Sequence, residues 1–152
     1  MSQLLTTAAV EPSRQLAYWT EMVCDTYVQL DCDAAADAHT IEGEIAVDQL
    51  ATLQLSRVTA TAQHVRRTPA RIAWASEDYF LVSIQSHGAG VVVQDGRSAR
   101  LAPGDFALYD STRPYELHFD GPFQQYVLKL PGPTLRTALR DTHRLTATSV
   151  SG

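Results

Sequence analysis

Short β-type segments separated by turn residues dominate the chain between Tyr27 and Leu130. Valine, isoleucine, leucine and aromatic residues recur in runs of four to nine residues, and Gly, Pro or Asp residues interrupt them. Five such runs are 79–86 (YFLVSIQS), 91–94 (VVVQ), 106–109 (FALY), 115–119 (YELHF) and 123–130 (FQQYVLKL). Runs of this length, with a turn signal every eight to twelve residues or so, predict an antiparallel sandwich or barrel. The pair Asp95-Gly96 is the strongest short hairpin signal of the series.

Two earlier segments, 39–46 and 50–66, alternate apolar and polar residues and extend the predicted strands. Helices are predicted at both ends of the β region. Leu16, Trp19, Val23 and Tyr27 recur at helical spacing after Pro12-Ser13, and Pro133 suits the first turn of a short helix near the C-terminus. We therefore expect a mainly β fold with an N-terminal helix and a short C-terminal helix.

Length and charge narrow the class of protein. A chain of 152 residues fits one domain with a real core, and its 45% hydrophobic content is ordinary for a globular protein. The net charge of −5 argues against nucleic acid as a direct partner, because phosphate binding needs a basic stripe. The sequence shows no signal-peptide pattern and no apolar run of about 20 residues, so the predicted compartment is the cytoplasm.

The predicted boundaries divide the chain into three parts. Residues 1–11 are expected to be a flexible N-terminus, and residues 12–145 to form the domain. Residues 146–152 (TATSVSG) are expected to be a truncated linker.

Four motifs in the second half of the chain occur in a characteristic order. They are the hairpin Gly96-Arg97, the turn Leu101-Ala102-Pro103-Gly104-Asp105, the segment Tyr109-Asp110-Ser111-Thr112-Arg113-Pro114-Tyr115, and the strand end Leu130-Pro131. This ordered set resembles the AraC-binding-like, cupin-type sensory domain of AraC/XylS transcription regulators. The helix with Arg14, Trp19 and Val23 and the region of Arg66, Arg67 and Arg71 are similar to the family pattern too, so the resemblance covers about residues 12–140.

The resemblance implies a cupin-like antiparallel β-barrel, or jelly roll, that recognises a small-molecule effector and forms a homodimer. It also implies a pair of helix-turn-helix units, placed after residue 152, that bind DNA. No membrane partner and no cofactor are implied. Two alternatives stay open: an atypical, metal-free cupin enzyme, and a stand-alone dimerisation or interaction module.

Histidine spacing argues against a cupin metalloenzyme. Cupin metal sites use two histidines on alternate positions of one strand, so that both side chains share a face. No two of His39, His64, His87, His118 and His143 lie within four residues of each other, so neither metal ligands nor catalytic residues are predicted. His64 and His118 could meet inside the barrel, although hydrogen-bonded structural histidines are the commoner case.

An effector pocket needs only apolar walls and a few fixed polar groups. The candidate pocket residues are the polar or amphipathic side chains expected to face inward: His64, Arg67, Trp74, Tyr79, Ser83, Tyr109, Tyr115, His118 and Tyr126. A buried arginine, Arg66 or Arg67, could bind a carboxylate effector through its guanidinium. The candidate dimerisation stripe is Leu135, Ala138 and Leu139, although a stripe of this kind more often packs on its own barrel.

Overall fold

The computed structural model describes residues 2–74 and 76–151. Three α-helices are present in this part of the chain: α1 (Gln15–Thr26), α2 (Pro69–Trp74) and α3 (Gly132–Ala138). Short 3₁₀ helices are η1 (Thr7–Ala9), η2 (Pro12–Arg14) and η3 (Thr142–Arg144). The strands are β1 (Ser2–Thr6), β2 (Asp31–Ala34), β3 (Gly43–Leu50), β4 (Leu53–Ala60), β5 (Gln63–Arg67), β6 (Tyr79–His87), β7 (Gly90–Gln94), β8 (Arg97–Leu101), β9 (Phe106–Asp110), β10 (Tyr115–Phe119) and β11 (Phe123–Pro131).

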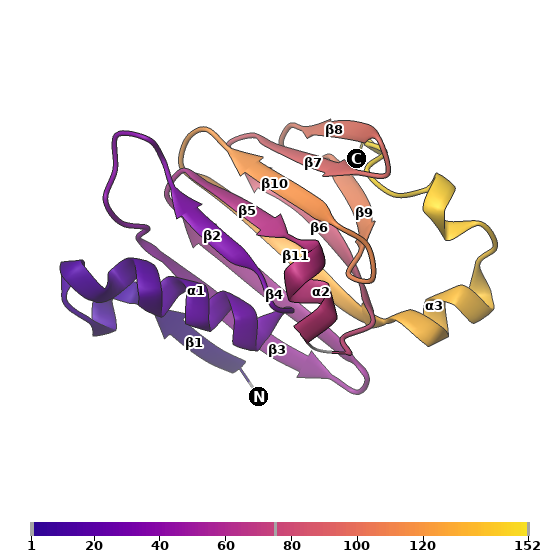
Figure 1. The fold of residues 1–152 in the computed structure, drawn as a ribbon, viewed down its shortest axis with the longest axis horizontal. Coiled ribbons are helices and arrows are strands. Elements are labelled where there is room, and N and C mark those ends of the chain that lie inside the picture. The colour runs from indigo at the N-terminus through magenta and orange to yellow at the C-terminus, as the bar shows by residue number, and fades with distance from the viewer. Residues whose placement is uncertain (1, 75, 152) are drawn as a thin grey trace.

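Two antiparallel sheets form the body of the molecule. One has six strands in the order β1-β3-β4-β11-β6-β9, and the other has five in the order β2-β5-β10-β7-β8. Strands neighbouring in sequence are often not neighbours in the sheets: β10 pairs with both β5 and β7, and β11 with both β4 and β6. In Figure 1, α1 and α3 lie at opposite sides of this β body. The predicted cupin-like antiparallel architecture with helices at both ends is confirmed.

The core lies between the inner faces of the two sheets, where apolar side chains alternate with outward polar ones. Helix α1 adds Trp19, Met22 and Val23 to it, each at most 5% exposed. These residues recur at spacings of three and four and so lie on one side of the helix. The apolar stripe predicted for this helix therefore does cover the barrel.

The predicted turns are present where the sequence placed them. Asp95 and Gly96 join β7 to β8 with φ angles of 54° and 75°, the left-handed pair that a two-residue hairpin turn requires. Gly104 has φ 97°, a conformation that side chains rarely adopt. Asp105 Oδ2 accepts a hydrogen bond from the Ala102 amide at 2.9 Å, as expected for an acidic residue closing its own turn.

The beginning of the chain differs from the predicted flexible segment. Ser2–Thr6 pair in register with β3 as an outer strand, and Leu5 packs against the core. The Thr7 hydroxyl then accepts from the Gly43 amide at 3.0 Å. Backbone pairing, which composition does not reveal, orders this segment. Met1 lies outside the described residues.

The segment predicted to be a linker also packs on the barrel. Thr146 and Ala147 are buried, and Thr146 and Val150 form isolated β-bridges with Leu108 and Phe106 of β9. The small side chains that made this segment look like a linker are those that fit closely against a strand. Gly152, the last residue of the predicted linker, lies outside the described residues.

None of the helices within residues 2–74 and 76–151 has the length and apolar character needed to cross a membrane.

Candidate functional site

Strand alternation brings four of the predicted pocket residues into the barrel interior. Arg67 of β5 and Tyr115 of β10 are directly opposite in register, and Ser83 of β6 and Tyr109 of β9 face them from the other sheet. The four side chains are at most 3% exposed. The Ser83 and Tyr109 hydroxyls lie 2.7 Å apart, and the rings of Tyr109 and Tyr115 have centroids 4.7 Å apart.

Burial keeps these tyrosines neutral. It raises the pKa of Tyr109 to about 12 and raises the pKa of Tyr115 well above its usual 10, because the charged phenolate is poorly solvated in the interior. Both hydroxyls are therefore hydrogen-bonding groups rather than acids at neutral pH. The cavity between them has a volume of only about 40 Å³, room for about one water molecule.

Arg67 is the one of the two adjacent arginines that points inward, and its side chain is 0% exposed. Its Nε donates to the Ser111 carbonyl at 2.9 Å, and its Nη1 donates to the Gln29 carbonyl at 2.9 Å and to Glu77 Oε1 at 3.2 Å. Its Nη2 is buried and has no hydrogen-bond partner among the described residues. Such an unmade bond costs about 1–3 kcal/mol, more when the group is charged.

A surface hollow of about 270 Å³ includes Arg67 in its lining, and we call it the Arg67 hollow; Arg66 and Glu116, which face outward, also line it, whereas the Arg67 side chain itself is 0% exposed. Its walls come from the end of β5, the start of β10 and the β7–β8 hairpin, including Tyr115, Gln94 and Pro114. Its volume is close to the lower end of ordinary ligand sites, which span about 300–1,000 Å³.

Four predicted pocket residues do not face the interior. His64 and His118 lie on strands whose inward residues are Gln63, Val65 and Arg67, and Leu117 and Phe119, so alternation turns both histidines outward. Trp74 ends α2 and is 70% exposed, with Arg71 stacked on its ring at 5.5 Å. Tyr126 is 38% exposed on the outer face of β11. A shift of one residue reverses the face of a strand, which is why the sequence did not fix these orientations.

Tyr79 takes an intermediate position at the start of β6. It is partly buried against the core, and the Lys129 ammonium lies 4.2 Å from its ring centroid. It lines neither the small interior cavity nor the Arg67 hollow.

The candidate dimerisation stripe is not covered by the barrel. Ala138 and Leu139 are exposed, Leu139 by 40%, and Leu135 is half-buried. Helix α3 ends at Ala138, and Leu139 is already extended with φ −125°. Within one chain the stripe is therefore only partly covered, at Leu135.

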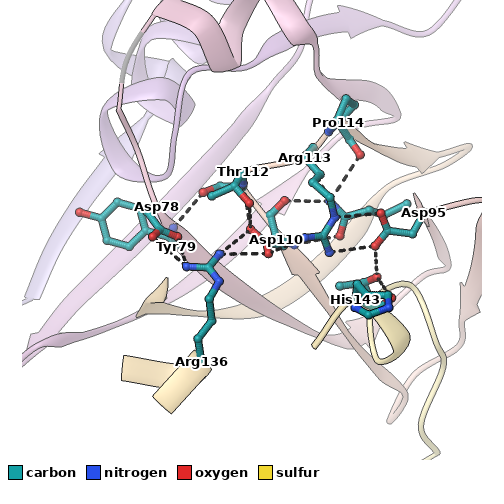
Figure 2. Close-up of polar contacts among 12 residues, drawn as sticks. Asp78, Tyr79, Asp95, Asp110, Thr112, Arg113, Pro114, Arg136 and His143 are labelled. Atoms are coloured by element: carbon teal, nitrogen blue, oxygen red, sulfur yellow. Dashed lines mark hydrogen bonds and ion pairs between the residues drawn. The ribbon is translucent and has the colours of Figure 1, made fainter. Parts of the chain in front are cut away.

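A network of ion pairs fastens the C-terminal segment to the barrel (Figure 2). Asp110 at the end of β9 has a fully buried carboxylate that accepts from Arg113 Nη1 at 3.1 Å and from Arg136 Nη2 at 3.2 Å. Arg136 also binds Asp78 at 2.7 Å, and Arg113 forms two bonds of 2.9 Å to Asp95. The hydrogen bond from Arg113 is the main reason that the pKa of Asp95 lies below its usual value.

Sequence reasoning missed the neutral polar side chains of the interior. Trp19 Nε1 donates to Gln63 Oε1 at 2.9 Å, and Gln125 Nε2 donates to Gln85 Oε1 at 2.8 Å. The three glutamines are at most 3% exposed. One signal in the sequence could have predicted the burial of Gln63: strand alternation places it on the same face as Val65 and Arg67.

Comparisons with known proteins agree with this architecture. A family model described as an AraC-binding-like domain matches residues 19–150. A Bacillus sp. (strain OxB-1) protein named "Uncharacterized protein in nit 5'region" is 44% identical over 147 residues, 97% of this chain and 57% of that protein. The transcriptional activator NphR of Rhodococcus sp is 36% identical over 102 residues, 66% of this chain and 30% of that protein.

Among solved structures, the AraC-like transcriptional activator CuxR superposes with a TM-score of 0.84 at 16% identity, over 100% of this chain and 55% of that chain. At this identity the likeness establishes the fold. The chain thus spans between about a third and just over half the length of these relatives.

Proposed function

The chain belongs to the AraC-binding-like domain family, and on that premise we propose that it is the effector-binding and dimerisation domain of an AraC/XylS-type transcription regulator. DNA would be bound by a helix-turn-helix part of the longer protein, in the cytoplasm. An effector that binds one arrangement of the domain more tightly would shift the population toward it. A coupling free energy of about 1–3 kcal/mol between effector and DNA sites is enough for a useful response.

The observation that carries the effector-binding half of this proposal is the unpartnered Nη2 of Arg67. A buried guanidinium is always charged, so its open donors favour a ligand that brings a negative acceptor. Arg67 is among the residues that line the Arg67 hollow, so we propose that such a ligand would enter there. Tyr115 and Gln94 line the same hollow, and both side chains are at most 3% exposed.

These groups favour a small carboxylate as effector. A carboxylate binds a guanidinium more strongly than a neutral acceptor does, because the bond is charge-assisted.

A thermal-shift screen of aromatic and aliphatic carboxylates, with sugars and amines for comparison, tests this proposal. We expect carboxylates to raise Tm, because a ligand that binds only the folded state stabilises it. Isothermal titration of a hit into Arg67→Lys should show binding weakened about tenfold or more, since lysine lacks the planar fork of donors.

Arg100→Lys, an exposed arginine on β8, is the matched control and should bind as the wild type does. Titration well below Tm separates lost binding from lost folding. An effector site at Arg67 would be contradicted if no carboxylate of the panel bound. It would also be contradicted if Arg67→Lys bound a hit with the affinity of the wild type.

The dimerisation half of the proposal is supported by the uncovered stripe on and after α3. Leu135, Ala138 and Leu139 offer apolar surface at the side of the barrel opposite α1 (Figure 1). Symmetric homodimers bury the same patch from each copy. We propose that a second copy of this chain covers the stripe.

Sedimentation of the wild type and of Leu139→Asp tests the dimer. The wild type should sediment as a dimer at micromolar concentration, and the variant should be monomeric because burying an unpaired carboxylate is costly. Leu50→Asp is the control, since Leu50 is also exposed but lies on the β3–β4 hairpin. A monomeric wild type, or a variant that still dimerises, would exclude this interface.

A further inference from the structure

His64, Glu116 and His118 form a cluster on the outer face of the five-stranded sheet, which we call the His-Glu cluster. His64 comes from β5, and Glu116 and His118 come from β10, two positions apart on the same face. His64 and His118 are directly opposite in the antiparallel register, and their rings stack with centroids 3.9 Å apart. The two histidines that the sequence left isolated therefore meet, outside the barrel rather than inside it.

The three side chains converge on one point. His64 Nε2 lies 2.8 Å from Glu116 Oε1, and His118 Nε2 lies 3.4 Å from the same oxygen. One ligand atom from each residue lies within 4.8 Å of the others. A tetrahedral metal ion with bonds of about 2.0–2.1 Å holds its ligands roughly 3.3 Å apart. The two distances to Glu116 Oε1 lie on either side of that spacing.

We propose that the His-Glu cluster binds a divalent transition-metal ion of the zinc class, with His64, Glu116 and His118 as its three protein ligands. Two imidazoles and a carboxylate are a ligand set that Zn²⁺ accepts, and a fourth position would stay open to water. The ion would bind ring nitrogens that carry no proton, so it would displace the hydrogen bond that now joins His64 to Glu116. This site lies on the opposite face of the sheet from the barrel interior and from Arg67.

Neighbouring charges are compatible with a cation there. On β2, Asp33 is opposite His64 in register and pairs with Arg66 at 2.9 Å, so the nearest arginine is already neutralised. On the other side of β10, β7 places Val91 opposite His118. The three ligands are each between 35% and 45% exposed, which leaves the site open to ions from solution.

A metal held between β5 and β10 would join two strands whose ligands are separated by 52 residues in sequence. It would be bound only in the folded state, because the unfolded chain does not bring these residues together. Zinc binding should therefore raise Tm, and the rise should grow with the concentration of free Zn²⁺.

The test titrates the purified chain with Zn²⁺ against a chromogenic chelator. The wild type should bind one equivalent with high affinity. Loss of an outer partner of a metal ligand already lowers affinity by about 10–100-fold, so Glu116→Gln and His118→Gln should lose at least that much. The double variant His64→Gln/His118→Gln should show neither the bound equivalent nor the zinc-dependent rise in Tm.

His39→Gln and His87→Gln are matched controls, since both residues are exposed histidines outside the cluster. Each should keep the full equivalent. The proposal would be overturned if the double variant still bound Zn²⁺ or if a control variant lost the bound equivalent. A wild type that does not bind Zn²⁺ would overturn it too. Anomalous scattering from zinc-soaked wild-type crystals needs no variant: a peak between the three side chains supports the site, and a peak only elsewhere refutes it.

Discussion

The guanidinium of Arg136, on α3, donates a hydrogen bond of 3.2 Å to the carboxylate of Asp110, at the end of β9. Asp110 is fully buried, whereas Arg136 is about one-third exposed. The contact therefore joins the exposed C-terminal helix to a charge that the barrel itself has removed from water.

Asp110→Asn should destabilise the fold by about 3 kcal/mol or more, because it removes one partner from two ion pairs and leaves the environment of a buried charge uncompensated. Asp78→Asn should cost about 1 kcal/mol or less, since Asp78 pairs with the same arginine but is 39% exposed. Urea unfolding followed by circular dichroism measures both. Equal losses would show that burial of Asp110 does not decide the strength of this anchor.

Acid should weaken the ion pair between Asp95, in the β7–β8 turn, and Arg113, in the β9–β10 loop. The folded pKa of Asp95 lies below 3.8, so its contribution is complete above that pH and is lost as the pH falls through the lower, folded value. The unfolding free energy of the wild type should therefore fall more steeply below about pH 4 than that of Asp95→Asn. Asp37→Asn, in an exposed loop, should keep the wild-type slope. Parallel curves for the wild type and Asp95→Asn would argue against the ion pair with Arg113.

Trp19→Phe should destabilise the protein by about 1–3 kcal/mol, because it leaves Gln63 Oε1 buried without the donor that it has at 2.9 Å. Trp74→Phe, at the exposed end of α2, should change the stability by no more than about 0.5 kcal/mol. Chemical denaturation of the two variants makes this comparison directly. A Trp19→Phe protein as stable as the wild type would mean that Gln63 finds another donor.

Gly43→Ala should cost about 1–3 kcal/mol through overpacking. A Cβ there would lie 2.7 Å from Ala60 Cβ and 2.8 Å from both the Thr59 carbonyl oxygen and the Trp19 ring. Gly121→Ala is the control, because a Cβ at Gly121 meets no atom within 4 Å. The change in Tm of each variant, measured by calorimetry, separates the two cases. A tolerated alanine at position 43 would require α1 to move away from β3.

Local signals in the sequence predicted much of this fold. The Asp95-Gly96 hairpin, the turn at Gly104 and the apolar face of α1 all follow from backbone preferences or helical spacing within a few residues. The pairing of β1 with β3 does not, because paired residues that are 38 or more positions apart leave no local mark in the sequence. Residues 50–66, which read as one alternating stretch, are two strands with a turn at Thr61-Ala62.

The candidate site was less accessible from sequence. Arg67 and Arg66 have the same neighbours and the same chemistry, and only the strand register decides that Arg67 is buried. The same register places His64 outside the barrel and opposite His118. The inward-facing glutamines were not predicted, because a polar side chain is by default expected to be exposed. Gln63, Gln85 and Gln125 can be buried because each has a hydrogen-bond partner in the interior.

The β-bridges from Thr146 and Val150 to β9 have a consequence for solubility. Strand β9 is the last strand of the six-stranded sheet, so its outer backbone groups would otherwise be free to pair with another chain. Uncovered edges of this kind are where natural β proteins begin to aggregate. Residues 146–150 thus cover the edge strand of this sheet. Any rearrangement that releases them would expose the edge of β9 and favour aggregation through edge-to-edge pairing.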